Sequence, residues 1–416
     1  MTYYFTMELH KAACEGDYNL ASKMLFSRRQ FDVNAIGPNG QTPLYLACTY
    51  NHLESVELLL EHGACMETGD IEGIRPLHIA CAWNDVTLAF LLLENGAEIN
   101  AMSNHQMTPL DVACRHGNSR IVEMLLVRGA ALEGNARFGP LHFATEAGHF
   151  HIADILLRQG ADIEAKTKEG LSPLQLACHF SHLRTARLLL DHGANLECSS
   201  DDGEHTPLVI ACYYGHLEMV RFLLDRGAEV NPTREMQWSP LHTACEFGYC
   251  EITRLLLDRG AGLEVKGCKA EATPLHIACE NGHPWIARVL LSRGADLEAR
   301  DISESTPLHI ACYGGNLDVV LVLIDHGACL EAKRREEMTA LHVACKFGRL
   351  DAATALLDNG ANVSAIDKHG STPMFTACRS NNTELVWLLA HRCPWLLMDL
   401  NHDVVHKGGL AGLHTE

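Results

Sequence analysis

A short motif returns at a nearly constant spacing and limits what this chain can fold into. At residues 305–312 it reads Ser-Thr-Pro-Leu-His-Ile-Ala-Cys, and its copies lie 31 to 34 residues apart. The proline of the motif, or the residue that replaces it, falls at positions 43, 76, 109, 140, 173, 207, 240, 274, 307, 340 and 373. A period of this length is typical of stacked structural repeats, which grow by adding neighbours instead of enlarging one core.

Each period predicts two short helices and an extended loop. Thr42 suits a helix N-cap and the proline after it suits the first helical position, so a first helix is expected over residues 43–48. A tight turn follows, and then a second helix over residues 53–60 that ends at Gly63. Residues 64–75 form the loop, called a finger here, that leads to the next cap.

Four short motifs of each period together resemble the ankyrin repeat: Thr-Pro-Leu-His-Ile-Ala, Gly-His, Leu-Leu-Leu and Gly-Ala-Asp. The resemblance covers about twelve units over residues 7–392. It implies an all-α solenoid of helix-turn-helix units with β-hairpin-like fingers, whose concave side commonly binds proteins. We expect a divergent N-terminal capping repeat at 1–40, eleven repeats at 41–392, and a short, partly flexible tail at 393–416.

Charge and hydropathy narrow the class of partner. The chain has 52 acidic and 33 basic residues, giving a net charge of -19. Nucleic acid binding needs clustered Lys and Arg, so we expect no nucleic-acid partner.

The sequence contains no apolar run of membrane-spanning length and does not begin like a signal peptide. We expect a monomer without direct membrane insertion, in the cytoplasm, with the nucleus as an open alternative.

Histidine and cysteine recur three residues apart in several repeats, which raises the question of a metal site. A zinc ion needs four ligands at about 2.0–2.3 Å, whereas neighbouring helices pack about 8–10 Å apart. We therefore expect no metal at these residues. The sequence has no Gly-rich phosphate loop after a strand, no nucleophile elbow and no His-Glu-x-x-His motif, so we also expect no cofactor and no catalytic site. The cysteines predict reduced, buried thiols, and the histidines predict hydrogen bonds within the turn. Ten of the 17 cysteines form one column of the repeat: Cys48, Cys81, Cys114, Cys178, Cys212, Cys245, Cys279, Cys312, Cys345 and Cys378.

A glutamate recurs at one equivalent position of the fingers. Stacked repeats would align these side chains as an acidic ladder, which is either a solvated face or a charge stripe that attracts a basic partner. The column comprises Glu67, Glu133, Glu164, Glu197, Glu264, Glu298 and Glu331.

Aromatic residues gather just after the Ala-Cys pair, although Phe, Trp and Tyr make up only 6% of the chain. Aromatic side chains dominate protein-binding hot spots because they bury a large area at low entropic cost. The alternative is that each ring only packs on the neighbouring repeat. The predicted protein-binding residues after Ala-Cys are Tyr50, Trp83, Phe180, Tyr213, Tyr214, Phe247, Tyr313 and Phe347. Those before the next cap are Met107, Trp238 and Met338.

The predicted function is a non-catalytic scaffold or adaptor that binds a partner protein across the concave surface of fingers and first helices. Two alternatives stay open. The Ala-Cys and Leu-Leu-Leu-x-x-Gly-Ala phrasing resembles ankyrin proteins with a C-terminal SOCS box, which implies a substrate-recognition subunit of a ubiquitin ligase, although the final residues lack the Leu-Pro pattern of that box. Long ankyrin proteins also bind transporters, which implies an adaptor that anchors a membrane protein.

Asparagine takes the place of the finger glutamate in two repeats, at Asn100 and Asn231, each with a leucine eight residues earlier. This resembles the ankyrin sites modified by an intracellular asparaginyl hydroxylase. We expect mass spectrometry of the chain from cells with active hydroxylase to show one added oxygen at these asparagines. Finding both unmodified would contradict the prediction.

Overall fold

The computed structural model describes residues 2–27, 31–133, 138–200, 205–231, 238–267 and 269–393, with side chains from residue 7 onward. These residues form paired α-helices joined by turns, with no extended strand among them. The predicted all-α array is therefore confirmed. The expected tail, apart from Cys393, lies outside the described residues. Among the helices that are described, none is long and apolar enough to cross a bilayer.

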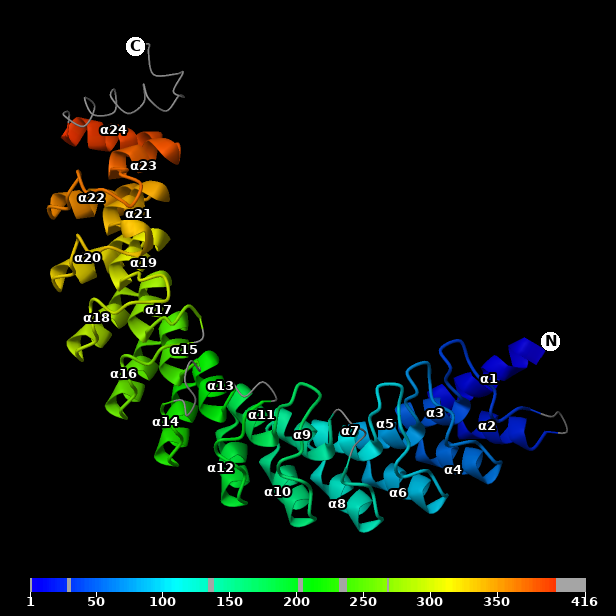
Figure 1. Ribbon diagram of the computed structural model, residues 1–416. Helices are drawn as coiled ribbons and strands as arrows, with labels where there is room; N and C mark the ends of the chain where they lie inside the picture. The colour runs from blue at the N-terminus through cyan, green and yellow to red at the C-terminus, as the bar shows by residue number, and fades with distance from the viewer. Residues whose placement is uncertain are drawn as a thin grey trace. The chain divides into compact units, whose positions relative to one another are not determined.

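Within each of the two compact units of the chain, the helices alternate between two rows (Figure 1). The first helices of the repeats are α1 (Thr2–Glu15), α3 (Pro43–Thr49), α5 (Pro76–Trp83), α7 (Pro109–His116), α9 (Pro140–Glu146), α11 (Pro173–His179), α13 (Pro207–Tyr213), α15 (Pro240–Phe247), α17 (Pro274–Glu280), α19 (Pro307–Gly314), α21 (Ala340–Lys346) and α23 (Pro373–Arg379). The second helices are α2 (Tyr18–Leu25), α4 (Leu53–Glu61), α6 (Val86–Glu94), α8 (Ser119–Val127), α10 (Phe150–Arg158), α12 (Leu183–Asp191), α14 (Leu217–Asp225), α16 (Cys250–Asp258), α18 (Pro284–Ser292), α20 (Leu317–Asp325), α22 (Leu350–Asp358) and α24 (Thr383–Arg392).

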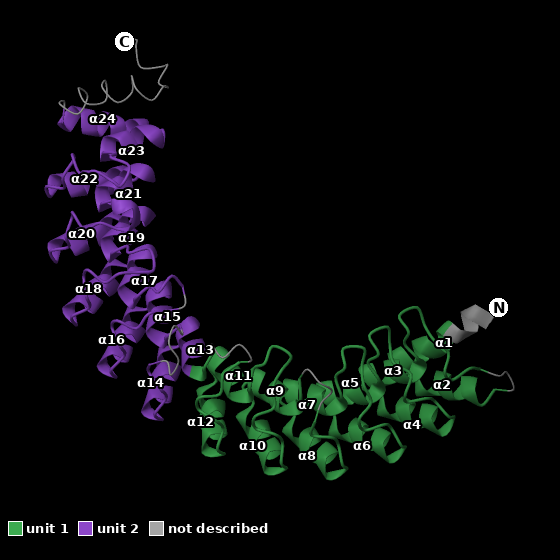
Figure 2. Cartoon of the chain, in the orientation of Figure 1, with its two compact units in different colours: residues 1–207 green, residues 208–416 purple. Residues whose placement is uncertain are grey.

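The chain divides into two compact units, residues 1–207 and 208–416 (Figure 2). Within each unit a first helix packs on the second helix of its own repeat and on the first helix of the next, as α21 does on α22 and α23. One 3-10 turn, η1 (Arg335–Glu337), lies in a finger of the second unit.

The Ala-Cys column builds the interior of each unit. Leu308, Ala311 and Cys312 are at most 1% exposed, and the same three positions are buried in most other repeats. Burying one leucine side chain contributes about 1.5–3 kcal/mol. Burial also raises the pKa of the Cys312 thiol far above its usual value, so these cysteines are inert, neutral core residues.

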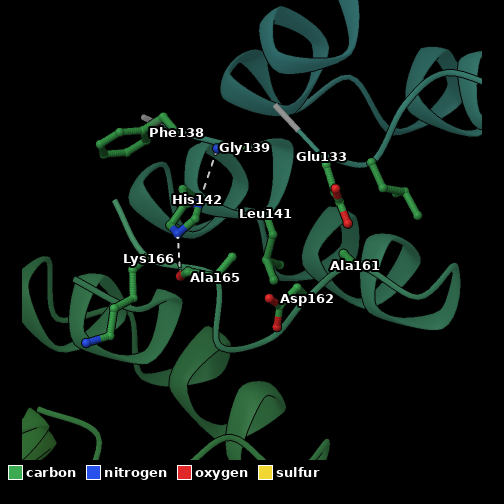
Figure 3. Close-up of a pocket in the computed structure, with 10 residues that line it drawn as sticks. Glu133, Phe138, Gly139, Leu141, His142, Ala161, Asp162, Ala165 and Lys166 are labelled. Carbon is green, nitrogen blue, oxygen red and sulfur yellow. Dashed lines mark hydrogen bonds between the residues drawn. The ribbon is translucent and has the colours of Figure 1, made fainter. Parts of the chain in front are cut away.

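A buried histidine joins each of several repeats to the next. In the second unit the backbone N–H of Thr306 donates to Nδ1 of His309 at 3.2 Å, so the ring proton sits on Nε2. Nε2 then donates to the carbonyl of Met338 in the following repeat at 3.1 Å. Figure 3 shows His142 in the first unit, which accepts the Gly139 N–H in the same way but bonds through Nε2 to the Ala165 carbonyl, nearer the start of the following finger. The histidines thus form hydrogen bonds as predicted, but they bond to the helix cap and to the next repeat instead of only within their own turn.

The turn between the two helices allows a side chain of the next repeat to approach the backbone. Gly148 has φ 74°, and a Cβ there would lie 2.7 Å from the imidazole of His182. That imidazole bonds through Nε2 to the Glu146 carbonyl at 2.9 Å. Gly248 and His283 repeat the arrangement in the second unit, with a bond to the Glu246 carbonyl at 3.0 Å. Glycine is therefore required here for both its backbone angle and its small size.

The finger glutamates form hydrogen bonds from one repeat to the next. Glu298 accepts the backbone N–H of Cys329 in the next repeat at 2.8 Å, and Asn100 accepts that of Ala131 at 2.9 Å. The same bond, at 2.6 to 2.9 Å, joins eight pairs: Asn34 with Cys65, Glu67 with Glu98, Asn100 with Ala131, Glu164 with Asn195, Asn231 with Gly262, Glu264 with Asp296, Glu298 with Cys329 and Glu331 with Asn362.

The histidine joints predict a loss of stability in mild acid. Burial lowers the pKa of His309 to about 4, below the usual value of about 6.5 that it regains on unfolding. Between about pH 6.5 and pH 4 the unfolded chain is protonated at this histidine and the folded chain is not. The contribution of His309 to the free energy of unfolding is therefore complete above about pH 6.5 and is lost as the pH falls toward 4. The native chain should lose free energy of unfolding between pH 7 and pH 5, and we expect His309→Gln to reduce that loss by about 1–2 kcal/mol. Urea unfolding at each pH measures the difference.

Residue Gln175 supplies the control for that experiment. It occupies the histidine position of its own repeat, where Ser172 N–H donates to Oε1 and Nε2 donates to the His205 carbonyl. Gln175→His should add a comparable acid dependence. Equal pH slopes in the two variants and the native chain would contradict the role assigned to the imidazole.

The glutamate column predicts a loss of stability on truncation but not on exchange for a shorter acceptor. Glu298→Ala is expected to lower the free energy of unfolding by about 1 kcal/mol, because the N–H of Cys329 loses its partner. Glu298→Asn should stay close to the native value, since Asn100 and Asn231 make this bond naturally. Urea unfolding checks both variants, and equal stability of Glu298→Ala and the native chain would show that the bond contributes nothing.

Candidate protein-binding surface

The aromatic residues predicted after Ala-Cys lie at the C-terminal ends of the first helices, with ring surface open to solvent. Their exposed fractions run from 39% for Phe247 to 71% for Trp83. We call the first-helix face of each unit the surface made by these helix ends and the finger residues beside them. It includes Tyr50, Trp83 and Phe180 in the first unit, and Tyr213, Tyr214, Phe247, Tyr313 and Phe347 in the second.

Stacking on the following turn holds four of these rings in place, those of Tyr50, Phe180, Tyr214 and Phe247. The ring of Phe247 stacks on Tyr249, two residues later, with centroids 6.0 Å apart and planes 24° apart. Tyr214 stacks on His216 in the same way at 6.0 Å. Because the stacked partner is the residue before the second helix, the turn itself fixes where each ring points. One side of the ring packs while the other remains exposed.

In the second unit, rings of neighbouring repeats also contact each other, and these contacts form two separate groups. Tyr213 meets Phe247 edge to face, with centroids 4.8 Å apart, and Tyr214 lies beside Tyr213. We call these three residues the Tyr213 cluster. Tyr313 meets Phe347 edge to face at 4.7 Å, and we call these two the Tyr313 pair. The packing between repeats that was weighed against binding is thus present, and it coexists with exposed surface.

The residues predicted before the next cap behave differently from these rings. Met107 and Trp238 are half-buried, and the Trp238 ring lies 5.0 Å from that of His242. Met338 is only 6% exposed, because its side chain turns inward where its carbonyl accepts the His309 bond. Since Met338 presents almost no side-chain surface to a partner, we leave it out of the first-helix face.

The two asparagines with a predicted hydroxylation both lie in the glutamate column. Asn100 is half-buried and Asn231 is exposed. Asn231 accepts the Gly262 N–H at 2.7 Å and donates to the Gly260 carbonyl at 3.1 Å. Their hydroxylation stays a prediction.

A hollow of about 290 Å³ in the first unit is a candidate small-ligand site (Figure 3). Its central polar groups already have partners: His142 uses both ring nitrogens, Lys166 donates to the Ser199 carbonyl, and Asp162 accepts the Glu164 N–H. The hollow therefore offers little to a ligand. Over the described part of the chain, no group of three or more His, Cys, Asp or Glu side chains could hold a metal ion.

Sequence reasoning located the exposed rings but not their support. The column of residues two places after Ala-Cys was visible because aromatic residues recur in it. The stacking of Phe247 on Tyr249 leaves a signal too, since a ring or imidazole often stands two positions later.

Comparison with known proteins identifies the repeats. A family model described as ankyrin repeats (3 copies) matches residues 9–103, 141–234, 230–301, 298–367 and 332–402. A second, described as ankyrin repeats (many copies), matches residues 92–139. These models describe ankyrin repeats alone, and no catalytic domain is among them.

Among curated proteins, the chain is similar to ankyrin repeat protein R96 of Acanthamoeba polyphaga mimivirus, with 41% identity over 51 residues. It is also similar to the human transient receptor potential cation channel subfamily A member 1, with 42% identity over 52 residues. Each match covers 12% of this chain and 5% of the relative, so the chain spans only a small fraction of the length of these proteins.

Among solved structures, the crystal structure of the human ASB11 ankyrin repeat domain is similar, with a TM-score of 0.49 and 29% sequence identity. The match covers 54% of this chain and 99% of that one. Ankyrin repeats generally act as protein-binding modules. Since the family models cover most of the sequence, the chain belongs to the ankyrin repeat family.

Proposed function

We propose that this protein is a non-catalytic adaptor or scaffold that binds a partner protein across its first-helix face. The observation that carries the proposal is the exposure of eight aromatic rings at the C-terminal ends of the first helices. An ankyrin repeat does not need an aromatic residue there, as Ala147 and Ser380 show at the equivalent position in other repeats.

The second unit carries the stronger part of this surface. The Tyr213 cluster and the Tyr313 pair together expose five rings, each of which already contacts another ring. A rigid ring loses little conformational freedom on binding, so most of the free energy of its burial is available to the complex. An interface of ordinary size buries about 1,200–2,000 Å² in total, and neighbouring repeats present such an area continuously.

The charge of the chain supports a protein partner over nucleic acid. With a net charge of -19, the protein as a whole repels a phosphate backbone. Acidic fingers and exposed aromatic rings instead suit a protein partner with basic or apolar surface.

The proposal is tested by replacing two rings together. Tyr214→Ala with Phe247→Ala should weaken partner capture by about a hundredfold, because two exposed hot-spot rings are lost. Thermal stability should change by no more than about 1 kcal/mol. The measurement is affinity purification with mass spectrometry from cells, followed by titration of the purified partner.

The control pair is Trp285→Ala with Leu321→Ala, two exposed apolar side chains on the second helices α18 and α20. These residues lie in the other row, so partner binding should be unchanged. Equal loss in both pairs would contradict the first-helix face as the binding surface. A loss of several kcal/mol in the Tyr214 and Phe247 variant would instead make these rings core residues.

The captured partner also decides between the more specific roles. Co-purified elongin and cullin subunits would assign the protein to a ubiquitin ligase as its substrate-recognition subunit. A co-purified membrane protein would assign it as an anchoring adaptor.

A further inference from the structure

A hollow of about 380 Å³ in the second unit lies between two fingers and the ends of α21 and α23. Lys346 is the last residue of α21 and Arg379 is the last residue of α23, so they hold the same position in adjacent repeats. Both are exposed and both line the hollow. Neither pairs with a carboxylate of the residues that the structure describes.

The two carboxylates that line the hollow are already engaged. Asp367 accepts the backbone N–H groups of His369 and Ser371, each at 2.8 Å. Glu336 pairs with Lys368 at 3.0 Å, and this bond holds the pKa of Glu336 below its usual range. Among the residues that the structure describes, the carboxylates beside Lys346 and Arg379 are therefore already bonded elsewhere.

This pair of positive charges is local to the end of the second unit. The equivalent positions in the four preceding first helices of that unit are Tyr213, Glu246, Glu280 and Tyr313, which are neutral or acidic. In a chain with 19 more acidic than basic residues, two adjacent cations on the first-helix face differ from their surroundings.

Apolar surface adjoins the cations directly. The Lys346 ammonium lies 5.7 Å from the ring of Phe347, and Phe347 packs edge to face against Tyr313. The surface thus runs from exposed aromatic rings to two donors within neighbouring repeats. An extended peptide with a large apolar side chain near an acidic one would match both parts.

We propose that this hollow receives an Asp or Glu side chain of the partner protein, while a neighbouring apolar side chain of the same segment packs on the Tyr313 pair. The proposal rests on the proposed protein-binding function and names the chemistry of the bound segment. Arg379 can take the carboxylate through two N–H groups, and Lys346 adds a second donor.

The experiment uses a randomised peptide library displayed on phage and selected against the full chain. The library should yield sequences with Asp or Glu close to Trp, Leu or Phe. A selected peptide, labelled with fluorescein, should bind the native chain in fluorescence anisotropy. Lys346→Glu with Arg379→Glu should weaken that binding by about tenfold or more, and higher salt should weaken binding to the native chain.

The matched control is Arg221→Glu with Arg288→Glu, which changes the net charge equally at exposed positions of the second helices α14 and α18. It should bind the acidic peptide with the native affinity. Circular dichroism establishes that each variant is folded. A version of the peptide with Asn and Gln in place of Asp and Glu should bind about tenfold more weakly.

Several results would overturn the inference. Equal enrichment of neutral or basic peptides, or acidic peptides that bind the Lys346 and Arg379 variant as well as the native chain, would remove the hollow as a carboxylate site. A peptide that binds only when it carries phosphoserine would show a phosphate site. A dimer of the native chain that the double variant abolishes would show that a second copy occupies this surface.

The same experiment separates the two proposals. Peptides whose binding depends on Tyr214 and Phe247 but not on Lys346 and Arg379 would overturn the acidic segment and keep the protein-binding function. Failure of every peptide to bind, together with failure to capture any partner from cells, would overturn both.

Discussion

The structure depends on hydrogen bonds that one repeat makes to the backbone of the next. The buried imidazole of His309 is the clearest case, because it accepts from the cap of its own helix and donates to the carbonyl of Met338 beyond it. Both partners are buried, so neither group could be left unpaired without a cost of about 1–3 kcal/mol. The bond therefore specifies how neighbouring repeats align, in a way that leucine packing alone does not.

Much of the fold could be predicted from the sequence, because each repeat carries its own helix start and stop residues. Thr306 and Pro307 start a helix, Gly315 ends it, and the period fixes the neighbours. The glutamate column could not be assigned in the same way. Glu298 accepts the backbone N–H of Cys329. Because every residue except proline has this donor, the sequence does not show which residue pairs with the glutamate.

The binding surface was only partly readable for a related reason. Exposure of Tyr213 and Phe247 follows from their place at the end of a helix, which the repeat predicts. Whether a finger residue such as Met338 points outward depends on the backbone path of the finger, and the period does not determine that path. Lys346 and Arg379 were not singled out, because each is one charged residue in the sequence and they become a pair only when α21 and α23 lie side by side.

The joints of the second unit have a consequence for how such a protein changes in length. His242, His276, His309 and His342 each bond to the residue just before the next cap. Every joint thus presents the same donor to the same acceptor, and any whole repeat can follow any other. After gain or loss of a complete repeat, the histidine of one repeat would still bond to the carbonyl before the next cap. After insertion of part of a repeat, a buried histidine N–H would lack its acceptor. The array is free to vary in whole repeats, and the spacing between its aromatic and basic surfaces would change in the same discrete steps.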